Sequence, residues 1–263
     1  LAMLAAPIAL ASAPPPPPPA TVEQLQSRLG ELLAQERIPG LGLALLKDHR
    51  VLWVGGVGMA DVENQVPVNA DTPFLVGSIS KSFTALAVMT LVEAGKIDLD
   101  APIRRYLPEA PIDNPWEATH PVTVAQVLEH TAGFDDLSLR NFVTERHNLP
   151  VQTAVPESAA AFRVRWPPGQ RYSYSNPGYL LAGALIEKVS GESFDDYLEQ
   201  KVLRPLGMHA ASYRYDAESG AAQGYNDALA REIYPHAGDR PAGALRASAR
   251  ELSGFVLAMM NRQ

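Results

Sequence analysis

The hydrophobic residues near the start of the chain follow a helical spacing and then give way to two strand-like runs. Thr21 opens a Thr-Val-Glu-Gln capping pattern, and the apolar residues after it recur every three or four positions, which predicts a helix that stops before Pro39. Residues 40–47 and 51–59 are apolar runs separated by three polar residues, a pattern that predicts an antiparallel hairpin. Two strands alone make a poor sheet, and we find no convincing third strand in the rest of the sequence.

The remainder of the chain is predicted to be mostly helical. Residues 78–94 are apolar on nearly every side, which is typical of a buried helix, and Gly95 provides its stop. Asn176 and Pro177 are typical of a helix cap and of the first helical position. The other predicted helices span 123–132, 178–189, 193–203 and 248–262, and the stretch 134–170 is predicted to be loop-rich and partly helical.

The first 20 residues differ from the rest in composition. Residues 1–13 are apolar and small and end in Ala-Ser-Ala, as in the hydrophobic region and cleavage site of a secretory signal, although a disordered Ala-rich leader has the same composition. Residues 14–19 are all proline, which favours a stiff, extended spacer. We therefore expect an exported protein, periplasmic or secreted, with a signal-like segment at 1–13, a linker at 14–20 and a folded domain at 21–263.

Charge and composition exclude several classes of function. The chain has 22 basic and 29 acidic residues and a net charge of −7, which argues against general nucleic-acid binding because that needs a basic surface. It has no cysteine, which excludes disulfides, metal–thiolate sites and cysteine nucleophiles. The histidines show no metal-binding spacing, so we expect neither a metal nor a cofactor. No segment is long and apolar enough to predict a membrane span.

The strongest chemical signal is the Ser-Ile-Ser-Lys motif that joins Ser78 to Lys81. If Ser78 opens the predicted helix, Lys81 lies one turn further on and on the same face. A serine hydroxyl is a weak nucleophile until a base takes its proton, and a buried, neutral lysine can be that base. The motif occurs by chance in many chains, but here the lysine lies on a mostly apolar helix, where a charge without a partner is costly.

A second signal is the Tyr-Ser-Asn motif that ends at a predicted helix start. Tyr174 offers a phenol that can exchange protons with a nearby lysine, and Asn176 offers an amide that can hold a substrate carbonyl. Considered alone, Asn176 is equally well explained as a helix cap and Tyr174 as a surface tyrosine.

Together these motifs resemble those of the penicillin-recognising serine hydrolases, which include class C β-lactamases, D-alanyl-D-alanine carboxypeptidases, D-aminopeptidases and related esterases. The resemblance implies an α+β, β-lactamase/transpeptidase-like fold in which an antiparallel sheet is flanked by helices, with a mostly helical subdomain over about 98–245. Four blocks in matching order carry it: 74–86, 93–103, 128–134 and 172–179.

The resemblance also implies roles for individual residues. Ser78 would be the acylated nucleophile, and its backbone N–H would form half of the oxyanion hole. Lys81 and Tyr174 would share the general-base and general-acid steps, and Asn176 would bind the substrate amide. His130 lies in the family's His-Thr-x-Gly block, which is usually structural, so we assign it no catalytic role. The implied partner is a small-molecule or peptide-like substrate, and β-lactam, D-peptide and ester substrates all stay open.

One family motif is not found in its expected place. The family carries Lys-Thr-Gly or His-x-Gly on a late strand beside the site. His236-Ala-Gly fits this pattern, but it precedes residues 241–252, which resemble a block that normally comes before that motif. We therefore expect that the chain stops early and that its C-terminal strands are missing.

Two alternatives to an enzyme stay open. A non-catalytic binding or scaffold protein on the same fold would explain the missing motif, because fold does not fix function. A helical interaction domain with chance motifs predicts instead that Lys81 is solvated and lies far from Tyr174.

Overall fold

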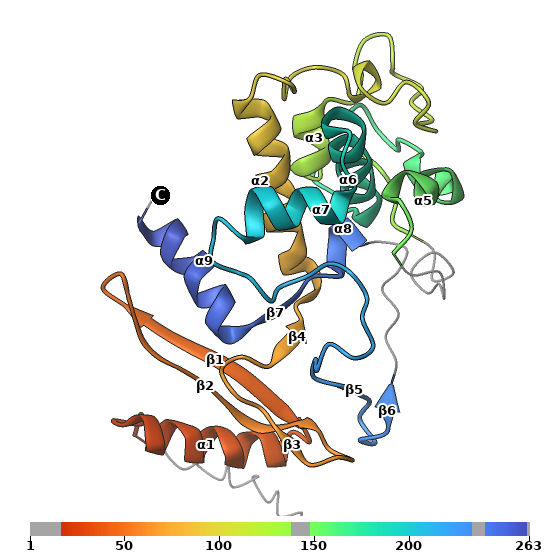
Figure 1. Cartoon of the computed structure of the whole chain (residues 1–263). Coiled ribbons are helices and arrows are strands. Elements are labelled where there is room, and N and C mark those ends of the chain that lie inside the picture. Colours follow the sequence, from red (N-terminus) through yellow and green to blue (C-terminus); the bar gives the residue numbers. More distant parts are fainter. Residues whose placement is uncertain (1–16, 138–147, 233–239, 262–263) are drawn as a thin grey trace, which may run out of the picture.

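Helix α1 (Val22–Gln35) and the hairpin of β1 (Gly40–Lys47) and β2 (Arg50–Asp61) form the strand-rich end of the protein (Figure 1). The computed structural model describes residues 17–137, 148–232 and 240–261. Thr21 caps α1 by accepting from the backbone N–H of Gln24, as its capping pattern predicts. The short β3 (Val66–Pro67) adds to β2, which gives the sheet order β1-β2-β3. Helix α1 packs on one face of this sheet and α9 (Ala249–Asn261) on the other.

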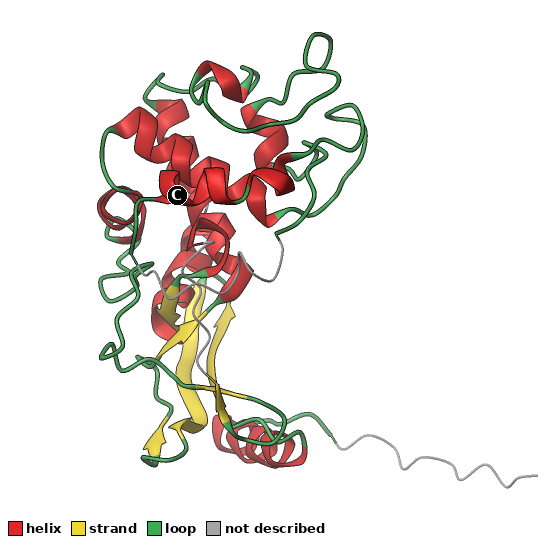
Figure 2. Cartoon of the chain, turned by 90° about the vertical axis from the view of Figure 1, so that its right-hand side faces the viewer, coloured by secondary structure: helices red, strands yellow, loops and turns green. Residues whose placement is uncertain are grey.

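The other end of the protein is rich in helices (Figure 2). It is built around two buried helices, α2 (Ser80–Glu93) and α6 (Asn176–Ser190), which pack against each other. Phe83, Phe134, Phe162 and Phe194 are fully buried and fill the core between the helices. The surrounding elements are η1 (Gly77–Ile79), η2 (Ile103–Arg105), α3 (Val124–Leu128), α5 (Val151–Glu157), η3 (Ala159–Phe162), α7 (Phe194–Leu198), the π-helical turn η4 (Glu199–Leu203) and α8 (Arg240–Gly243).

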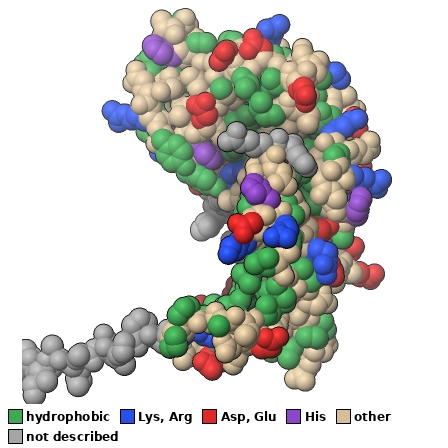
Figure 3. Space-filling view, turned by 90° about the vertical axis from the view of Figure 1, so that its left-hand side faces the viewer, with side chains coloured by type: hydrophobic (Ala, Val, Ile, Leu, Met, Phe, Trp, Pro, Cys, Tyr) green, Lys and Arg blue, Asp and Glu red, His purple; other side chains and the backbone are tan. Residues whose placement is uncertain are grey.

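The described residues form two further pairs of short strands. β4 (Pro73–Leu75) pairs antiparallel with β7 (Arg246–Ser248), and β5 (Gly224–Tyr225) pairs with β6 (Arg231–Glu232). The expectation that the sequence offers no further strand is therefore wrong. These strands are only two or three residues long and have no periodic pattern of their own, so tertiary pairing alone defines them. In the space-filling view, the outline of the molecule is hollowed between its two ends (Figure 3).

The helical predictions are largely confirmed, with two corrections near the motifs. Helix α2 begins at Ser80, whereas Ser78 lies in the preceding 3₁₀ turn η1. The N-cap of α6 is Ser175, whose side chain accepts from Gly178, so Asn176 is the first helical residue and not the cap. The predicted signal segment and His236 lie outside the described residues. The predicted domain boundaries stay a prediction.

Candidate active site

Ser78 lies where β4 passes into α2, and several hydrogen bonds fix that turn. Gly77 has a φ of +54°, a left-handed conformation that glycine adopts without steric cost. The Ser80 hydroxyl donates to the carbonyl of Gly77 at 2.6 Å and accepts from the N–H of Leu245 at 3.0 Å. The N–H of Val76 donates to the carbonyl of Leu245 at 2.9 Å. Leu245, two residues after α8, thus bonds Val76 and Ser80, which lie on either side of Ser78.

Lys81 projects from the first turn of α2 toward Ser78, as the motif spacing predicts. Its side chain is buried, with 5% of its surface exposed. Its Nζ donates to the Ser78 hydroxyl at 3.1 Å and to the backbone carbonyl of Ala242 at 2.8 Å. The same nitrogen lies 4.9 Å from the ring centre of Tyr174 and 5.6 Å from that of Tyr179. Among the described residues, no carboxylate pairs with this amine, and its partners are neutral oxygens and aromatic faces.

Tyr174 reaches the same serine from the loop before α6. Its hydroxyl donates to the Ser78 hydroxyl oxygen at 2.8 Å. Ser78 Oγ thus has two groups beside it, an amine and a phenol, and either can receive its proton when that group is unprotonated. This arrangement contradicts the interaction-domain alternative, which requires a solvated Lys81 far from Tyr174.

Asn176 stands beside this group, and its closest partner is an acidic residue that sequence reasoning missed. Its Nδ2 donates to Asp136 at 3.1 Å (Oδ1) and 3.4 Å (Oδ2), and its backbone N–H donates to the same carboxylate at 3.4 Å. The carboxylate can only accept, so it fixes the amide with the nitrogen toward Asp136. Asn176 lies two residues after Tyr174 in the chain, and no hydrogen bond joins it to Ser78 or Lys81 among the described contacts.

Tyr179, one helical turn into α6, lies against the same group. Its hydroxyl donates to the carbonyl of Leu128 at 3.1 Å. Burial, with a smaller effect of the nearby Tyr174, raises the pKa of Tyr179 to about 12. Tyr179 therefore stays a neutral phenol at physiological pH and packs beside Lys81 without adding a charge.

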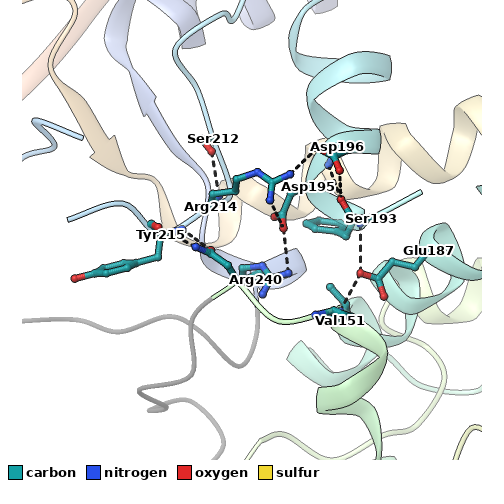
Figure 4. Close-up of polar contacts among 12 residues, drawn as sticks. Val151, Glu187, Ser193, Asp195, Asp196, Ser212, Arg214, Tyr215 and Arg240 are labelled. Atoms are coloured by element: carbon teal, nitrogen blue, oxygen red, sulfur yellow. Dashed lines mark hydrogen bonds and ion pairs between the residues drawn. The ribbon is translucent and has the colours of Figure 1, made fainter. Parts of the chain in front are cut away.

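A buried ion pair anchors the segment that holds Lys81 (Figure 4). Arg240 at the start of α8 lies 3.2 Å from Asp195 of α7, and both side chains are 5% exposed. Arg214 lies 3.8 Å from the same carboxylate oxygen. Burial raises the pKa of Asp195, while the two arginines act in the opposite direction. The next residue, Pro241, accepts a 2.7 Å hydrogen bond from Thr84 of α2, so the pair secures α8 beside the turn that carries Lys81.

A second buried carboxylate joins the helices around α6 (Figure 4). Glu187 of α6 accepts from the backbone N–H groups of Val151 at 2.9 Å and Gln152 at 3.0 Å, at the start of α5. It also accepts from Phe194 at 3.3 Å, at the start of α7. One side chain thus pairs with three first-turn N–H groups, two in α5 and one in α7, which lack a partner within their own helices.

The described residues contain no group of three or more histidine, aspartate or glutamate side chains that could hold a metal ion. None of the helices in the described ranges is long and apolar enough to cross a bilayer.

A comparison with known protein families matches the Beta-lactamase model to residues 25–263. The chain belongs to the beta-lactamase family. Its relatives include a beta-lactamase of Yersinia enterocolitica, 27% identical over 239 residues, which span 90% of this chain and 59% of that protein. They also include protein flp of Staphylococcus aureus (strain NCTC 8325 / PS 47), 24% identical over 247 residues, which span 91% of this chain and 49% of that protein. The chain thus spans about half to three-fifths of the length of these relatives.

Solved structures confirm the predicted fold of this beta-lactamase family member. The octameric penicillin-binding protein homologue from Pyrococcus abyssi is 31% identical with a TM-score of 0.77, over 92% of this chain and 57% of that one. The D-alanine carboxypeptidase AmpC from Burkholderia cenocepacia is 26% identical with a TM-score of 0.74, over 92% and 65%. The D-amino acid amidase from Ochrobactrum anthropi SV3 is 28% identical with a TM-score of 0.76, over 90% and 68%. These likenesses confirm the resemblance to the penicillin-recognising serine hydrolases.

Proposed function

We propose that this chain is a serine hydrolase that forms an acyl-enzyme on Ser78 from an amide, β-lactam or ester substrate. One observation carries the proposal: the Ser78 hydroxyl lies 3.1 Å from the buried Lys81 amine and 2.8 Å from the Tyr174 phenol. A nucleophile beside two proton-exchanging groups is the arrangement that acyl transfer needs. The carboxypeptidase and amidase among the structural neighbours support a hydrolase.

The reaction follows from this geometry. Ser78 Oγ attacks the carbonyl carbon, and its proton passes to Lys81 or Tyr174, whichever is unprotonated. The negative charge that develops on the carbonyl oxygen is stabilised by the backbone N–H of Ser78, at the positive end of α2. The carbonyl–leaving-group bond then breaks, and the same pair returns the proton to the leaving group. Water attacks the resulting ester by the reverse sequence and regenerates the serine.

Asn176 orients the substrate in this proposal. One hydrogen of its amide nitrogen is directed to Asp136, and the second can donate to an amide carbonyl of the substrate. This role predicts a preference for substrates that carry an amide next to the reacting carbonyl. We further propose that the protein is exported, on the basis of the signal-like composition of residues 1–13.

The first test is the site of covalent labelling. The chain is incubated with a fluorophosphonate, and intact mass and peptide mapping locate the adduct. We expect one adduct on Ser78 in the wild type, none in Ser78→Ala, and full labelling of Ser82→Ala, a matched change of an exposed serine on α2. Equal labelling of the wild type and Ser78→Ala would contradict the proposal.

The substrate class is then decided by turnover. A chromogenic β-lactam, a p-nitrophenyl ester and a D-alanyl amide are each offered to the wild type and to Lys81→Met. The class whose hydrolysis depends on Lys81 is the substrate class. No adduct and no Lys81-dependent turnover would favour the alternative, a non-catalytic binding protein on the same fold.

A further inference from the structure

His130, just after α3, has a backbone conformation that is uncommon for its residue type. Its φ is +63°, in the left-handed region that non-glycine residues rarely adopt. Its carbonyl accepts from the N–H of Ser173 at 2.8 Å, and its Nδ1 accepts from the N–H of Ser175 at 3.1 Å. These two serines flank Tyr174, so His130 holds the backbone on both sides of the tyrosine.

The imidazole also packs against the side chain between them. Its ring stacks on the ring of Tyr174 with centroids 4.4 Å apart and planes 29° apart. Tyr179 and Tyr172 pack around the same imidazole at 5.4 Å and 5.8 Å. Because Ser175 is further fixed by its hydroxyl, which donates to the carbonyl of Asp135 at 3.2 Å, the whole Tyr174 turn has little freedom.

We infer that His130 is a positioning residue, which clamps Tyr174 so that the phenol lies within hydrogen-bond distance of Ser78. The inference rests on the proposed function, and it gives His130 a role that its usual structural assignment does not. The contacts divide the clamp into two parts. The Nδ1 atom accepts from Ser175 and so fixes the backbone next to Tyr174. The stacked ring fixes the direction in which the Tyr174 phenol points.

The clamp requires a neutral imidazole. An Nδ1 that accepts from Ser175 carries no proton, so the ring proton is on Nε2. Burial lowers the pKa of His130, and the positive charge of Lys81 lowers it further, while Asp136 acts in the opposite direction. In the described part of the chain, the titratable groups that face the ring are Lys81 from α2, Tyr179 from α6, Tyr172 and Tyr174 from the loop before α6, and Asp136.

Protonation therefore opens the clamp at low pH. A proton on Nδ1 replaces the acceptor with a donor that points at the N–H of Ser175. It also places a positive charge on the imidazole, on the side of the ring environment that includes Lys81. Both effects displace Tyr174 from Ser78, so the reactivity of Ser78 falls on the acid side as His130 becomes charged.

Two variants separate the parts of the clamp. His130→Asn keeps a residue that tolerates a left-handed backbone but removes the ring, and His130→Phe keeps a ring but removes the acceptor. His49→Asn is a matched control, because His49 is exposed, also has a positive φ of +60°, and lies in the turn between β1 and β2. Each variant is first shown to be folded by circular dichroism and thermal unfolding.

The decisive readout is the second-order rate of Ser78 labelling by the fluorophosphonate as a function of pH. We expect a loss of about tenfold or more in both His130 variants, none in His49→Asn, and an acid-side decrease in the wild type that His130→Phe lacks. Because His130 acts through Tyr174, His130→Asn/Tyr174→Phe should be no slower than Tyr174→Phe alone. Additive losses, or wild-type rates in both His130 variants, would overturn the clamp.

A second readout does not depend on activity. The histidine Cε1–H resonances are titrated by NMR, with His130 assigned by its absence in His130→Asn. We expect His130 to titrate below the ordinary value of about 6.5 and to move toward it in Tyr174→Ala. An unlabelled Ser78 overturns the proposed function, and the clamp is then judged by this titration alone. An ordinary midpoint that Tyr174→Ala leaves unchanged overturns the clamp.

Discussion

The hydroxyl of Tyr174 lies 2.8 Å from the hydroxyl of Ser78, although 96 positions separate the two residues in the sequence. Lys81, one helical turn after Ser78, reaches the same oxygen. The contact of Ser78 with Lys81 is local in the sequence, whereas its contact with Tyr174 is long-range. The candidate site therefore exists only when the loop before α6 is docked against the start of α2.

The buried amine of Lys81 gives the first prediction. Lys81→Met keeps a chain of similar length but removes one of the two groups that can accept the Ser78 proton. We expect the rate of fluorophosphonate labelling to fall by about 100-fold or more, with little loss of thermal stability. Lys81→Arg should not restore the rate, because a guanidinium does not give up its proton in proteins. The control is Lys96→Met, a change of an exposed lysine beyond the end of α2. A labelling rate in Lys81→Met close to that of Lys96→Met would contradict the role.

The contact between Asp136 and Asn176 gives a prediction about substrate binding. Asp136→Asn removes the carboxylate that fixes the Asn176 amide, so the amide can turn its oxygen toward the substrate. We expect KM for an amide substrate to rise about three- to tenfold while labelling by the fluorophosphonate, which has no such amide, is unchanged. Asp135→Asn removes the same charge one residue earlier, where it pairs with Arg165 at 3.7 Å, and is the matched control. Equal KM values for the two variants would exclude this role of Asp136.

The pKa of His130 gives a prediction about stability. Because burial lowers this pKa in the folded state, the unfolded chain binds a proton more readily between the two pKa values. The free energy of unfolding therefore falls as the pH drops below about 6.5 and levels off below the folded pKa. Urea unfolding is measured at pH 7.5 and 5.5. Between these two values, the free energy of unfolding should decrease more in the wild type than in His130→Asn. His49→Asn should behave as the wild type, and a decrease that is the same in all three proteins would refute the prediction.

Close packing of α6 on α8 gives a prediction about a glycine. A Cβ added at Gly183 would collide with the ring of Pro241 and lie 3.1 Å from Val151. Gly183→Ala should therefore cost about 1–3 kcal/mol and also slow the labelling of Ser78, because Pro241 precedes the carbonyl that holds Lys81. A Cβ added at Gly30 of α1 would meet one side-chain atom at 3.9 Å, which is ordinary contact. Gly30→Ala should therefore stabilise the protein by about 0.5–1 kcal/mol. Thermal unfolding measures the stability changes of both variants. A Gly183→Ala protein as stable as the wild type would show that α8 can shift without loss of stability.

The sequence predicts the elements whose signals are local. The capping pattern at Thr21 begins α1, and α2 ends just before Gly95, as predicted. The strand pair β4–β7 could not be predicted, because Phe74 meets Ala247 only through the tertiary fold. The start of α2 was misplaced by two residues because the 3₁₀ turn at Ser78 has the same apolar surroundings as the helix.

The candidate site likewise contains contacts that the sequence predicts and contacts that depend on the tertiary fold. The spacing of Ser78 and Lys81 predicts their contact, whereas the approach of Tyr174 followed only from the family resemblance. Asp136 was missed because a carboxylate in a polar loop has no distinguishing pattern, and Ala242 because it contributes a backbone carbonyl that any residue could supply. His130 was visible in its motif, but its stacking on Tyr174 depends on a contact between distant loops.

The buried pair of Arg240 and Asp195 gives the last prediction. Arg240→Met leaves the Asp195 carboxylate buried, and among the described residues its remaining cationic partner is Arg214 at 3.8 Å. We expect this single change to lower the free energy of unfolding by about 3 kcal/mol, since an uncompensated buried charge is costly. The double variant Arg240→Met/Asp195→Leu removes both charges and should recover most of that loss, because apolar side chains can fill the same buried space.

Urea unfolding of Arg240→Met, Asp195→Leu and the double variant gives a double-mutant cycle for this ion pair. Labelling of Ser78 should recover together with stability in the double variant, because Thr84 and Val76 still bond the segment from Pro241 to Leu245. The control is the exposed pair of Arg204 and Glu199, where Arg204→Met should change the unfolding free energy by less than about 1 kcal/mol. If Arg240→Met is as mild as Arg204→Met, the buried pair does not anchor α8. The carbonyl that accepts from Lys81 is then held by the hydrogen bonds of Thr84 and Val76 to this segment.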